Sequence, residues 1–239
     1  MGLPPVWPQP VAAPQGMPGR TRRRGIGGLD RSAALAWPGK LAPAIHQPLR
    51  ALATWSGAIA GLLLILVGGL IQAAVPWPLE PDRWTLVGLP ITLQVPALLL
   101  TALVCGPRSA MLASVGYLSL GLLQLPVFQG GGGAAYLLDP GFGFLAGFIP
   151  AAWLTGRLAR QSGMADPLRL LGTTVIGLVV IQACGVLNLI LGSLTGRWGP
   201  GLGSLLITYS LAPLPSQLLL CCAVAAVALL LRRVLLVEP

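Results

Sequence analysis

The sequence predicts an all-α integral membrane domain of six transmembrane helices, with both termini in the cytoplasm. Of its 239 residues, 55% are hydrophobic and only 9% are charged, whereas soluble domains carry about 25% charged residues. So few charged side chains could not cover a protein surface against water. Residues 51–239 consist mainly of apolar runs of membrane-spanning length, separated by short polar or proline-rich stretches.

The first fifty residues differ in composition from the rest. They are rich in proline, glycine and arginine and show no hydrophobic periodicity. Such a segment cannot bury enough apolar surface to offset its chain entropy, so it is predicted to be disordered. The predicted organisation is therefore a disordered tail over 1–50 and a six-helix membrane domain over 51–239.

The first two apolar segments are bounded or interrupted by prolines. The first runs from about 53 to 75 and ends at a pair of prolines. The second, about 86–105, contains Pro90 and Pro96, so we expect its helix to be broken or kinked.

The other four segments follow in order along the chain. A Gly-Pro-Arg turn at 106–108 leads to the third segment, about 109–125. The remaining segments span about 142–156, 170–194 and 203–231. Each is long and apolar enough to be read as one crossing of the bilayer.

The placement of positive charge predicts the orientation of these segments. When six spans alternate sides, thirteen of the fifteen Lys and Arg residues fall on one face, and only Arg83 and Arg197 fall on the other. Cytoplasmic loops carry the excess of Lys and Arg, so the termini are predicted to be cytoplasmic. The glycine-rich stretch 125–144 then lies outside.

Composition also disfavours several classes of function. The net charge of +9 is concentrated in the tail, where it suits anionic lipid and membrane orientation better than nucleic acid. The four cysteines lack the spacing of a metal site. The only histidine, His46, lies in the tail and the acids after residue 50 lie in loops or at the terminus. Neither histidine-based nor paired-carboxylate catalysis is therefore supported, and we predict no enzyme and no cofactor.

Four consecutive glycines, Gly130 to Gly133, form the loosest part of the membrane domain. A phosphate-binding loop would need a lysine after its glycines, and the only lysine is Lys40. A hinge, a plain connector and a lid over a binding site remain open for this stretch. Asp139 and Pro140 stiffen its exit toward the next helix.

The polar residues within the spans are almost all uncharged, and they suggest a pocket for a largely neutral ligand, because amides both donate and accept hydrogen bonds. Each could also bond a neighbouring helix. Pro213 and Pro215 would free backbone carbonyls, which is tolerated where a cavity is lined. The polar residues are Gln72, Thr92, Gln94, Gln124, Gln182, Asn188, Ser216 and Gln217.

Small residues recur every fourth position in the first segment, at Ala53, Gly57 and Gly61. A face of this kind lets another helix approach closely. The spacing alone leaves open whether that helix belongs to this chain or to a partner subunit.

Four motifs in fixed order resemble the BioY family, the biotin-specific substrate-binding (S) subunits of energy-coupling-factor (ECF) transporters. They are Pro90, Thr92 and Gln94 in P-x-T-x-Q; the turn Gly106-Pro107-Arg108; Gly121 to Pro126 before VFQGGGG; and Pro140-Gly141-Phe142-Gly143-Phe144 leading to Gly147-Phe148. The resemblance covers roughly residues 55–232.

The resemblance implies a six-helix subunit that captures a vitamin from outside and has no ATPase of its own. It implies docking on a transmembrane coupling subunit driven by two ATPase subunits, through the small residues Ala53, Gly57 and Gly61. The loop between the third and fourth helices, with Gly130 to Gly133 and Asp139, would close over the ligand.

Within this frame Gln94 and Thr92 are expected to contact the polar ring of biotin, Asn188 and Gln217 to line the opposite wall, and Tyr136 to belong to the cover. Near the last helix, Gln217 and Leu220 stand where the family typically has an acid and a lysine. The ligand is therefore expected to be biotin or a close relative. Two alternatives stay open: an S subunit for another neutral solute, and a membrane scaffold that binds no solute.

Overall fold

The computed structural model describes residues 42–80, 83–123, 125–128, 131–161, 163, 166–199 and 201–235. The chain divides into two units, Met1–Ala44 and Ile45–Pro239, and the fold described below is that of the second. The predicted disorder of residues 1–41 concerns a segment outside the described residues.

Helix α1, Ala42–Leu70, begins earlier and ends earlier than the sequence predicts. Its first residues belong to the segment that we expected to be disordered, so the helical part of the chain starts at Ala42. After Leu70 a single residue, Ile71, leads into a strand, which takes the last four residues of the predicted first segment.

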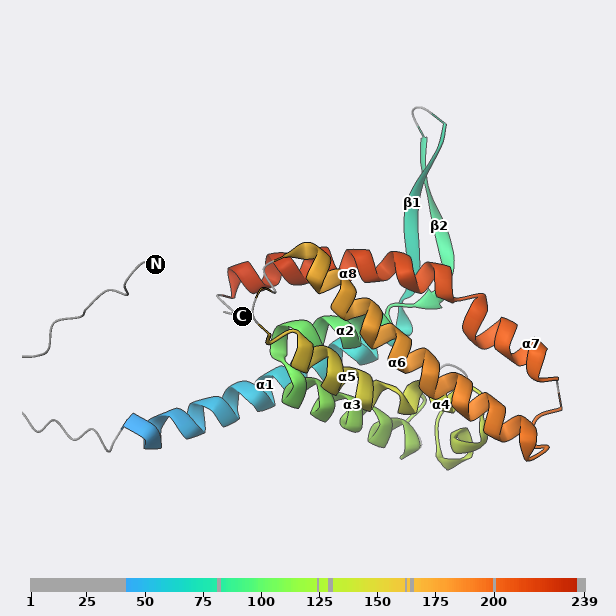
Figure 1. Cartoon of the computed structure of the whole chain (residues 1–239), viewed down its shortest axis with the longest axis horizontal. Coiled ribbons are helices and arrows are strands. Elements are labelled where there is room, and N and C mark those ends of the chain that lie inside the picture. Colours follow the sequence, from blue (N-terminus) through green and yellow to red (C-terminus); the bar gives the residue numbers. More distant parts are fainter. Residues whose placement is uncertain are drawn as a thin grey trace, which may run out of the picture. The chain divides into compact units, whose positions relative to one another are not determined.

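An antiparallel hairpin separates α1 from the next helix, and it was not expected. Strand β1, Gln72–Glu80, pairs with β2, Arg83–Thr92, and the hairpin extends away from the helices (Figure 1). The prediction of a second helix from residue 86 was therefore wrong over 86–92. Pro90 has no N–H to offer a helix, and the β-branched Val87, Ile91 and Thr92 favour a strand.

The short helix α2, Gln94–Cys105, takes the remainder of the predicted second segment. Pro96 lies in its first turn, where backbone N–H groups have no helical partner, so this proline marks a helix start and causes no kink. Gly106, with φ of 86°, then turns the chain into α3, Pro107–Leu122, as the Gly-Pro-Arg turn predicted.

The second half of the chain is helical where the sequence predicted it. A 3-10 helix η1, Ala134–Leu138, precedes α4, Phe142–Ala146, and α5, Phe148–Leu158. Helix α6 spans Pro167–Leu194. The last segment is divided into α7, Leu202–Leu206, the π-helical turn η2, Ile207–Leu211, and α8, Leu214–Val234. In the described part of the chain, α4–α5 and α7–α8 each act as one segment, which gives six in total.

Helix α2 occupies the centre of the packing. Its Leu98 belongs to a core shared with α3, α5 and α6 that includes Tyr117 and Phe148. The next residue, Leu99, belongs to a second core with α6 and α8 that includes Leu178. Lipid tails are as apolar as these side chains, so close van der Waals packing holds the helices together.

The outer surfaces of the helices are apolar. Three helical stretches are long and apolar enough to cross a membrane, namely Leu49–Leu70, Pro167–Leu194 and Leu202–Val234. Large side chains on them, such as Trp55 and Val179, are more than half exposed, which suits contact with lipid and not with water.

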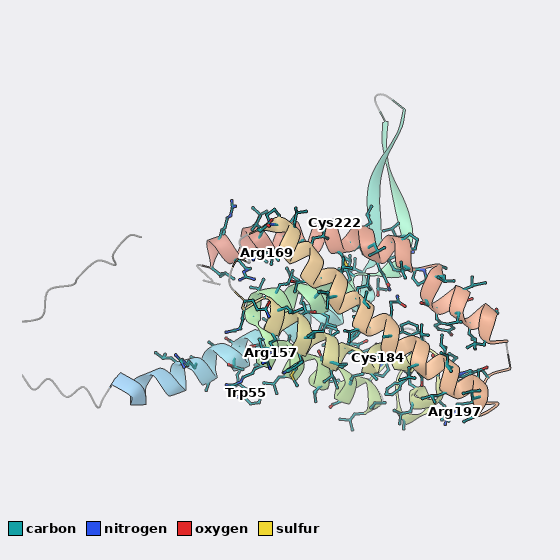
Figure 2. The ribbon with its side chains drawn as sticks, viewed as in Figure 1. Trp55, Arg157, Arg169, Cys184, Arg197 and Cys222 are labelled. Carbon is teal, nitrogen blue, oxygen red and sulfur yellow. The ribbon has the colours of Figure 1, made fainter. Side chains whose placement is uncertain are left out.

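The arginines separate toward two ends of the helices. Arg169 lies in the first turn of α6 and Arg197 just beyond its last turn, and in the view of Figure 2 Arg157 lies on the same side as Arg169, with Arg197 on the opposite side. The Arg160 Nη2 donates to the Cys105 carbonyl at 3.2 Å. This contact ties the end of α5 to the end of α2, which agrees with the charge separation that the sequence predicts.

Candidate functional site

A cavity of about 460 Å³ lies among the broken ends of the helices. Ligand pockets usually measure about 300–1,000 Å³. The residues that line it come from the end of β2, the start of α2, η1 and the turn after it, α4, α5, α6 and the segment from η2 to α8. Four of the five residues predicted to bind substrate are among them: Thr92, Gln94, Tyr136 and Gln217.

Irregular backbone explains where the cavity forms. In η2 the Ala212 N–H donates to the Ile207 carbonyl at 2.8 Å, one residue further than in an α-helix. Pro213 follows and has no N–H to continue the ladder. Ala212 and Pro213 both line the cavity, as expected for non-helical backbone at membrane depth. The predicted role of Pro213 as a pocket wall is consistent with this geometry.

Gln94 is the most unusual polar residue of the cavity. It begins α2 and lines the cavity, yet only 7% of it is exposed. Its Nε2 is buried and makes no hydrogen bond of good geometry among the described residues, although the Gln94 side chain lies beside the Tyr117 hydroxyl, which donates to the Val127 carbonyl. An unpaired buried amide donor costs about 1–3 kcal/mol, so this group is suited to donate to a ligand.

Gln217, in contrast to Gln94, has a hydrogen-bond partner, which its side-chain oxygen accepts from. The Gln182 Nε2 donates to Gln217 Oε1 at 2.7 Å, and the Ser210 Oγ donates to Gln182 Oε1 at 2.8 Å. These amide orientations follow from the hydrogen-bond network. Because the Gln217 oxygen is engaged, its Nε2 is the group available to the cavity. Gln94 and Gln217 can therefore each provide an amide donor to the same cavity.

Aromatic stacking positions Tyr136 at the cavity. The rings of Tyr117 and Phe128 are 5.4 Å apart, and those of Phe128 and Tyr136 are 4.7 Å apart. Such pairs add about 0.5–1.5 kcal/mol beyond the burial of their area. Burial raises the pKa of the Tyr136 hydroxyl to about 12, and the nearby Asp139 carboxylate adds to the rise. Tyr136 therefore stays protonated at neutral pH and can both donate and accept.

Asp139 also lines the cavity, at the turn between η1 and α4. Its Oδ1 accepts a hydrogen bond from the Gly141 N–H at 2.7 Å. A Cβ at Gly141 would lie 3.0 Å from Asp139 Oδ1, 3.5 Å from Tyr209 Cε1 and 3.6 Å from Tyr136 Oη. Asp139 and the two tyrosines therefore gather around Gly141, which leaves them room.

The glycine-rich stretch that was predicted to cover the ligand lies close to α3. The Gly133 N–H donates to the Gly121 carbonyl at 2.7 Å, and Gly133 has φ of 98°. A Cβ at Gly132 would collide with the Leu125 carbonyl. These glycines are therefore required by backbone geometry, and Gly131, Gly132 and Gly133 do not line the cavity. Gly130 lies outside the described residues, and a gating role for the stretch stays a prediction.

Asn188 is not brought together with the other predicted binding residues. It is not among the residues that line the cavity, and its Nδ2 donates to the Pro140 carbonyl at 3.1 Å. A Cβ at Gly143 would collide with the Asn188 Cβ. In this structure Asn188 holds the start of α4 against α6.

Two of the three small residues of α1 pack against helices of the same chain, and the third is exposed. A Cβ at Gly57 would lie 3.1 Å from Cys105 Cβ and from Ser109 Oγ, and a Cβ at Gly61 would collide with Thr101. Both glycines therefore allow α1 to approach α2 and α3 of the same chain. Ala53 is exposed and remains a candidate for contact with a partner.

Sequence reasoning did not select several residues of the cavity wall. Phe144, Phe148, Ile181 and Tyr209 all line the cavity. Phe144 and Phe148 were part of the motif at the start of the fourth segment, which was the available signal. Tyr209 carried no local pattern, because the π-helical turn that presents it is not encoded in a recognisable spacing.

Comparison with known proteins identifies relatives of this chain. Residues 47–236 match the BioY family. The chain is 33% identical over 123 residues to the probable biotin transporter BioY of Lysinibacillus sphaericus, covering 52% of this chain and 57% of that protein. It is 37% identical over 128 residues to the biotin transporter BioY of Thermotoga maritima, covering 53% of this chain and 69% of that protein.

A solved structure gives the fold. The crystal structure at 2.1 Å of the S-component for biotin from an ECF-type ABC transporter superposes with a TM-score of 0.56 at 20% identity, covering 78% of this chain and 94% of that chain. This likeness shows an all-α, six-helix membrane fold like that of an ECF S-component, as the sequence predicted. Because the family match extends over most of the sequence, this chain is a multi-pass membrane protein that belongs to the BioY family.

Proposed function

We propose that this chain is the substrate-capture subunit for the uptake of biotin, or a close relative, from outside the cell. The observation that carries the proposal is the Nε2 of Gln94, a buried donor that makes no hydrogen bond of good geometry among the described residues, at the wall of a cavity of about 460 Å³. A ligand carbonyl in that cavity would satisfy it.

The chemistry of the ureido ring of biotin matches the cavity wall. Its carbonyl accepts hydrogen bonds and its two N–H groups donate them. Gln94 offers a donor and Thr92 a hydroxyl that can do either, while the Nε2 of Gln217 offers a second donor. Phe144 and Phe148 add apolar surface for the rest of the ligand. In this assignment Gln94 and Thr92 contact the ring, and Gln217 lies on the α8 wall.

Energy for transport would come from other proteins. The relatives are named as transporters, in line with a non-enzymatic role for this chain, and the related S-component comes from an ECF-type ABC transporter. The glycine stretch has no lysine for a nucleotide phosphate. We infer an ECF transmembrane coupling subunit and two ATPase subunits as partners, with the exposed Ala53 side of α1 as a candidate contact.

The test is a titration of the purified protein with biotin in detergent. We expect saturable binding at micromolar concentration or below. Gln94→Ala should weaken binding about three- to tenfold, the equivalent of one neutral hydrogen bond. Gln72→Ala is the matched control, because Gln72 is an exposed glutamine that donates to the Leu89 carbonyl in the hairpin.

The outcomes separate the candidate functions. Absence of biotin binding at micromolar concentration would remove the substrate assignment. Binding of a different uncharged compound in a thermal-shift screen would indicate an S subunit for another neutral solute. Copurification with a coupling subunit and ATPases supports transport, whereas partners without ATPases favour a scaffold.

A further inference from the structure

Asp139 brings a negative charge to the wall of the cavity. Among the lining residues in the described part of the chain, the others are apolar, aromatic, hydroxyl or amide side chains. The carboxylate is half-buried, and its Oδ1 is held by the Gly141 N–H at 2.7 Å. The backbone thus fixes this charge at the cavity, although its position in a turn would otherwise let it face solvent.

The surroundings of Asp139 are hydroxyl and aromatic groups. A Cβ added to Gly141 would lie 3.0 Å from Asp139 Oδ1, 3.5 Å from Tyr209 Cε1 and 3.6 Å from Tyr136 Oη, so the three side chains meet at this position. Tyrosine hydroxyls can donate to a carboxylate but do not neutralise it. A charge in this part of the wall therefore acts on whatever occupies the cavity.

The cavity is small enough for the Asp139 charge to act on a ligand group anywhere inside it. A space of about 460 Å³ is on the order of 8 Å across, which is comparable with the Debye length of about 8 Å at physiological ionic strength. A ligand carboxylate held inside therefore lies within about one Debye length of Asp139, where salt screens their repulsion only in part. Coulomb repulsion over such a distance corresponds to a loss of affinity of about two- to thirtyfold, for an effective dielectric constant between about 80 and about 20.

The amide donors of the wall favour a neutral acceptor on the ligand. Gln94 presents an Nε2 that makes no hydrogen bond of good geometry among the described residues, and Gln217 accepts from Gln182 through its oxygen, which leaves its own Nε2 for the cavity. Neutral N–H donors of this kind suit a carbonyl oxygen and supply no full charge to offset a ligand carboxylate.

We propose that Asp139 is a specificity-determining residue that disfavours an anionic group inside the cavity, so that the chain prefers an uncharged amide or ester derivative of biotin to the free acid. This inference rests on the proposed function, because it concerns the same cavity and the same ring. It goes beyond the proposed function by specifying that the side chain of the ligand ends in an uncharged amide or ester and not in a carboxylate.

The experiment compares two ligands that share the ring and differ in charge. Biotin and its primary amide are titrated by isothermal calorimetry into the full chain purified in detergent. We expect the amide to bind about two- to thirtyfold more tightly than the acid. Asp139→Asn should improve the affinity for biotin relative to that for the amide, so that the ratio of the two affinities approaches one, and Asn keeps the oxygen that accepts from the Gly141 N–H.

Asp166→Asn is the matched control. It changes the net charge by the same amount at the N-cap of α6, where Asn caps as well as Asp, and Asp166 does not line the cavity. The preference for the amide should persist in this variant.

Each of the other possible results contradicts either the role of Asp139 or the proposed function. Equal binding of the two ligands, or tighter binding of the acid, refutes the role of Asp139 but keeps the proposed function. A parallel loss of both affinities in Asp139→Asn would identify Asp139 as a partner of the ring and likewise refute it. Failure of both ligands to bind refutes the proposed function, and this inference with it.

Discussion

The side chains of Gln182 and Gln217 join α6 to α8 through one hydrogen bond of 2.7 Å, from the Nε2 of Gln182 to the Oε1 of Gln217. Gln182 is 8% exposed and is itself held by the Ser210 hydroxyl. The bond sets the orientation of the Gln217 amide, so a residue that does not line the cavity decides which group Gln217 presents to it. Gln182 is in this sense a positioning residue.

Replacement of Gln182 by leucine should weaken ligand binding without changing a residue of the cavity wall. Gln182→Leu keeps the bulk of the side chain and removes both hydrogen bonds, so the Gln217 amide is free to rotate. We expect the dissociation constant for biotin to rise about three- to tenfold. Calorimetry gives the measurement, and Gln161→Leu, at an exposed position beyond α5, is the control. Unchanged affinity would show that the orientation of Gln217 does not matter.

A methyl group at Gly185 should disturb the cavity from behind its wall. A Cβ there would collide with the ring of Phe144, which lines the cavity. Gly185→Ala is therefore expected to push this ring into the cavity and reduce biotin binding at least about tenfold, with an overpacking cost of about 1–3 kcal/mol in stability. Gly172→Ala on the same helix meets no atom within 4 Å and should bind normally. Similar affinities for the two variants would contradict this account.

Arg232 should contribute to stability through a buried contact that its neighbour lacks. Arg232 is 6% exposed, and its Nη1 donates to the Ala159 carbonyl at 3.0 Å, which ties the end of α8 to the end of α5. We expect Arg232→Gln to lower the free energy of unfolding by about 2 kcal/mol. Arg233→Gln, at an exposed position, should change it by less than about 0.5 kcal/mol. Chemical or thermal unfolding in detergent distinguishes the two, and equal effects would refute the importance of the contact.

The glycine stretch should be intolerant of a side chain at Gly132. A Cβ there would collide with the carbonyl of Leu125, and backbone cannot move aside as a flexible side chain can. Gly132→Ala is therefore expected to lower the melting temperature, by the equivalent of about 1–3 kcal/mol. The reference is Gly203→Ala in α7, where no atom lies within 4 Å. If both variants melt alike, the close backbone contact is not needed for the fold.

The long apolar segments were the most predictable part of the fold. The predicted 170–194 and 203–231 correspond to α6 and to the region from α7 to α8, because an uninterrupted apolar stretch of about 20 residues in a membrane can satisfy its backbone only as a helix. The hairpin formed by β1 and β2 was missed. The residues of β2 are apolar enough to resemble part of a membrane span, and the extended form is stabilised only by pairing with β1, which precedes it directly in the chain.

The candidate site was predicted in part. Gln94 and Gln217 were selected as polar residues in apolar spans, and both line the cavity. Asn188 fits the same description, yet its amide donates to the Pro140 carbonyl. Polarity in a span indicates that a partner exists, but it does not indicate whether that partner is a ligand or the protein itself.

The sequence by itself determined that the chain is a membrane protein, where most of its helices lie and which family motifs it carries, because composition, apolar length and local spacing are properties of the chain in one dimension. The tertiary structure alone decided that Gly57 and Gly61 allow α1 to approach α2 and α3, that Gln182 orients Gln217, and that Asp139 reaches the cavity wall. Those facts depend on which helices meet and on how closely their backbones approach. Contacts between segments far apart in sequence determine both.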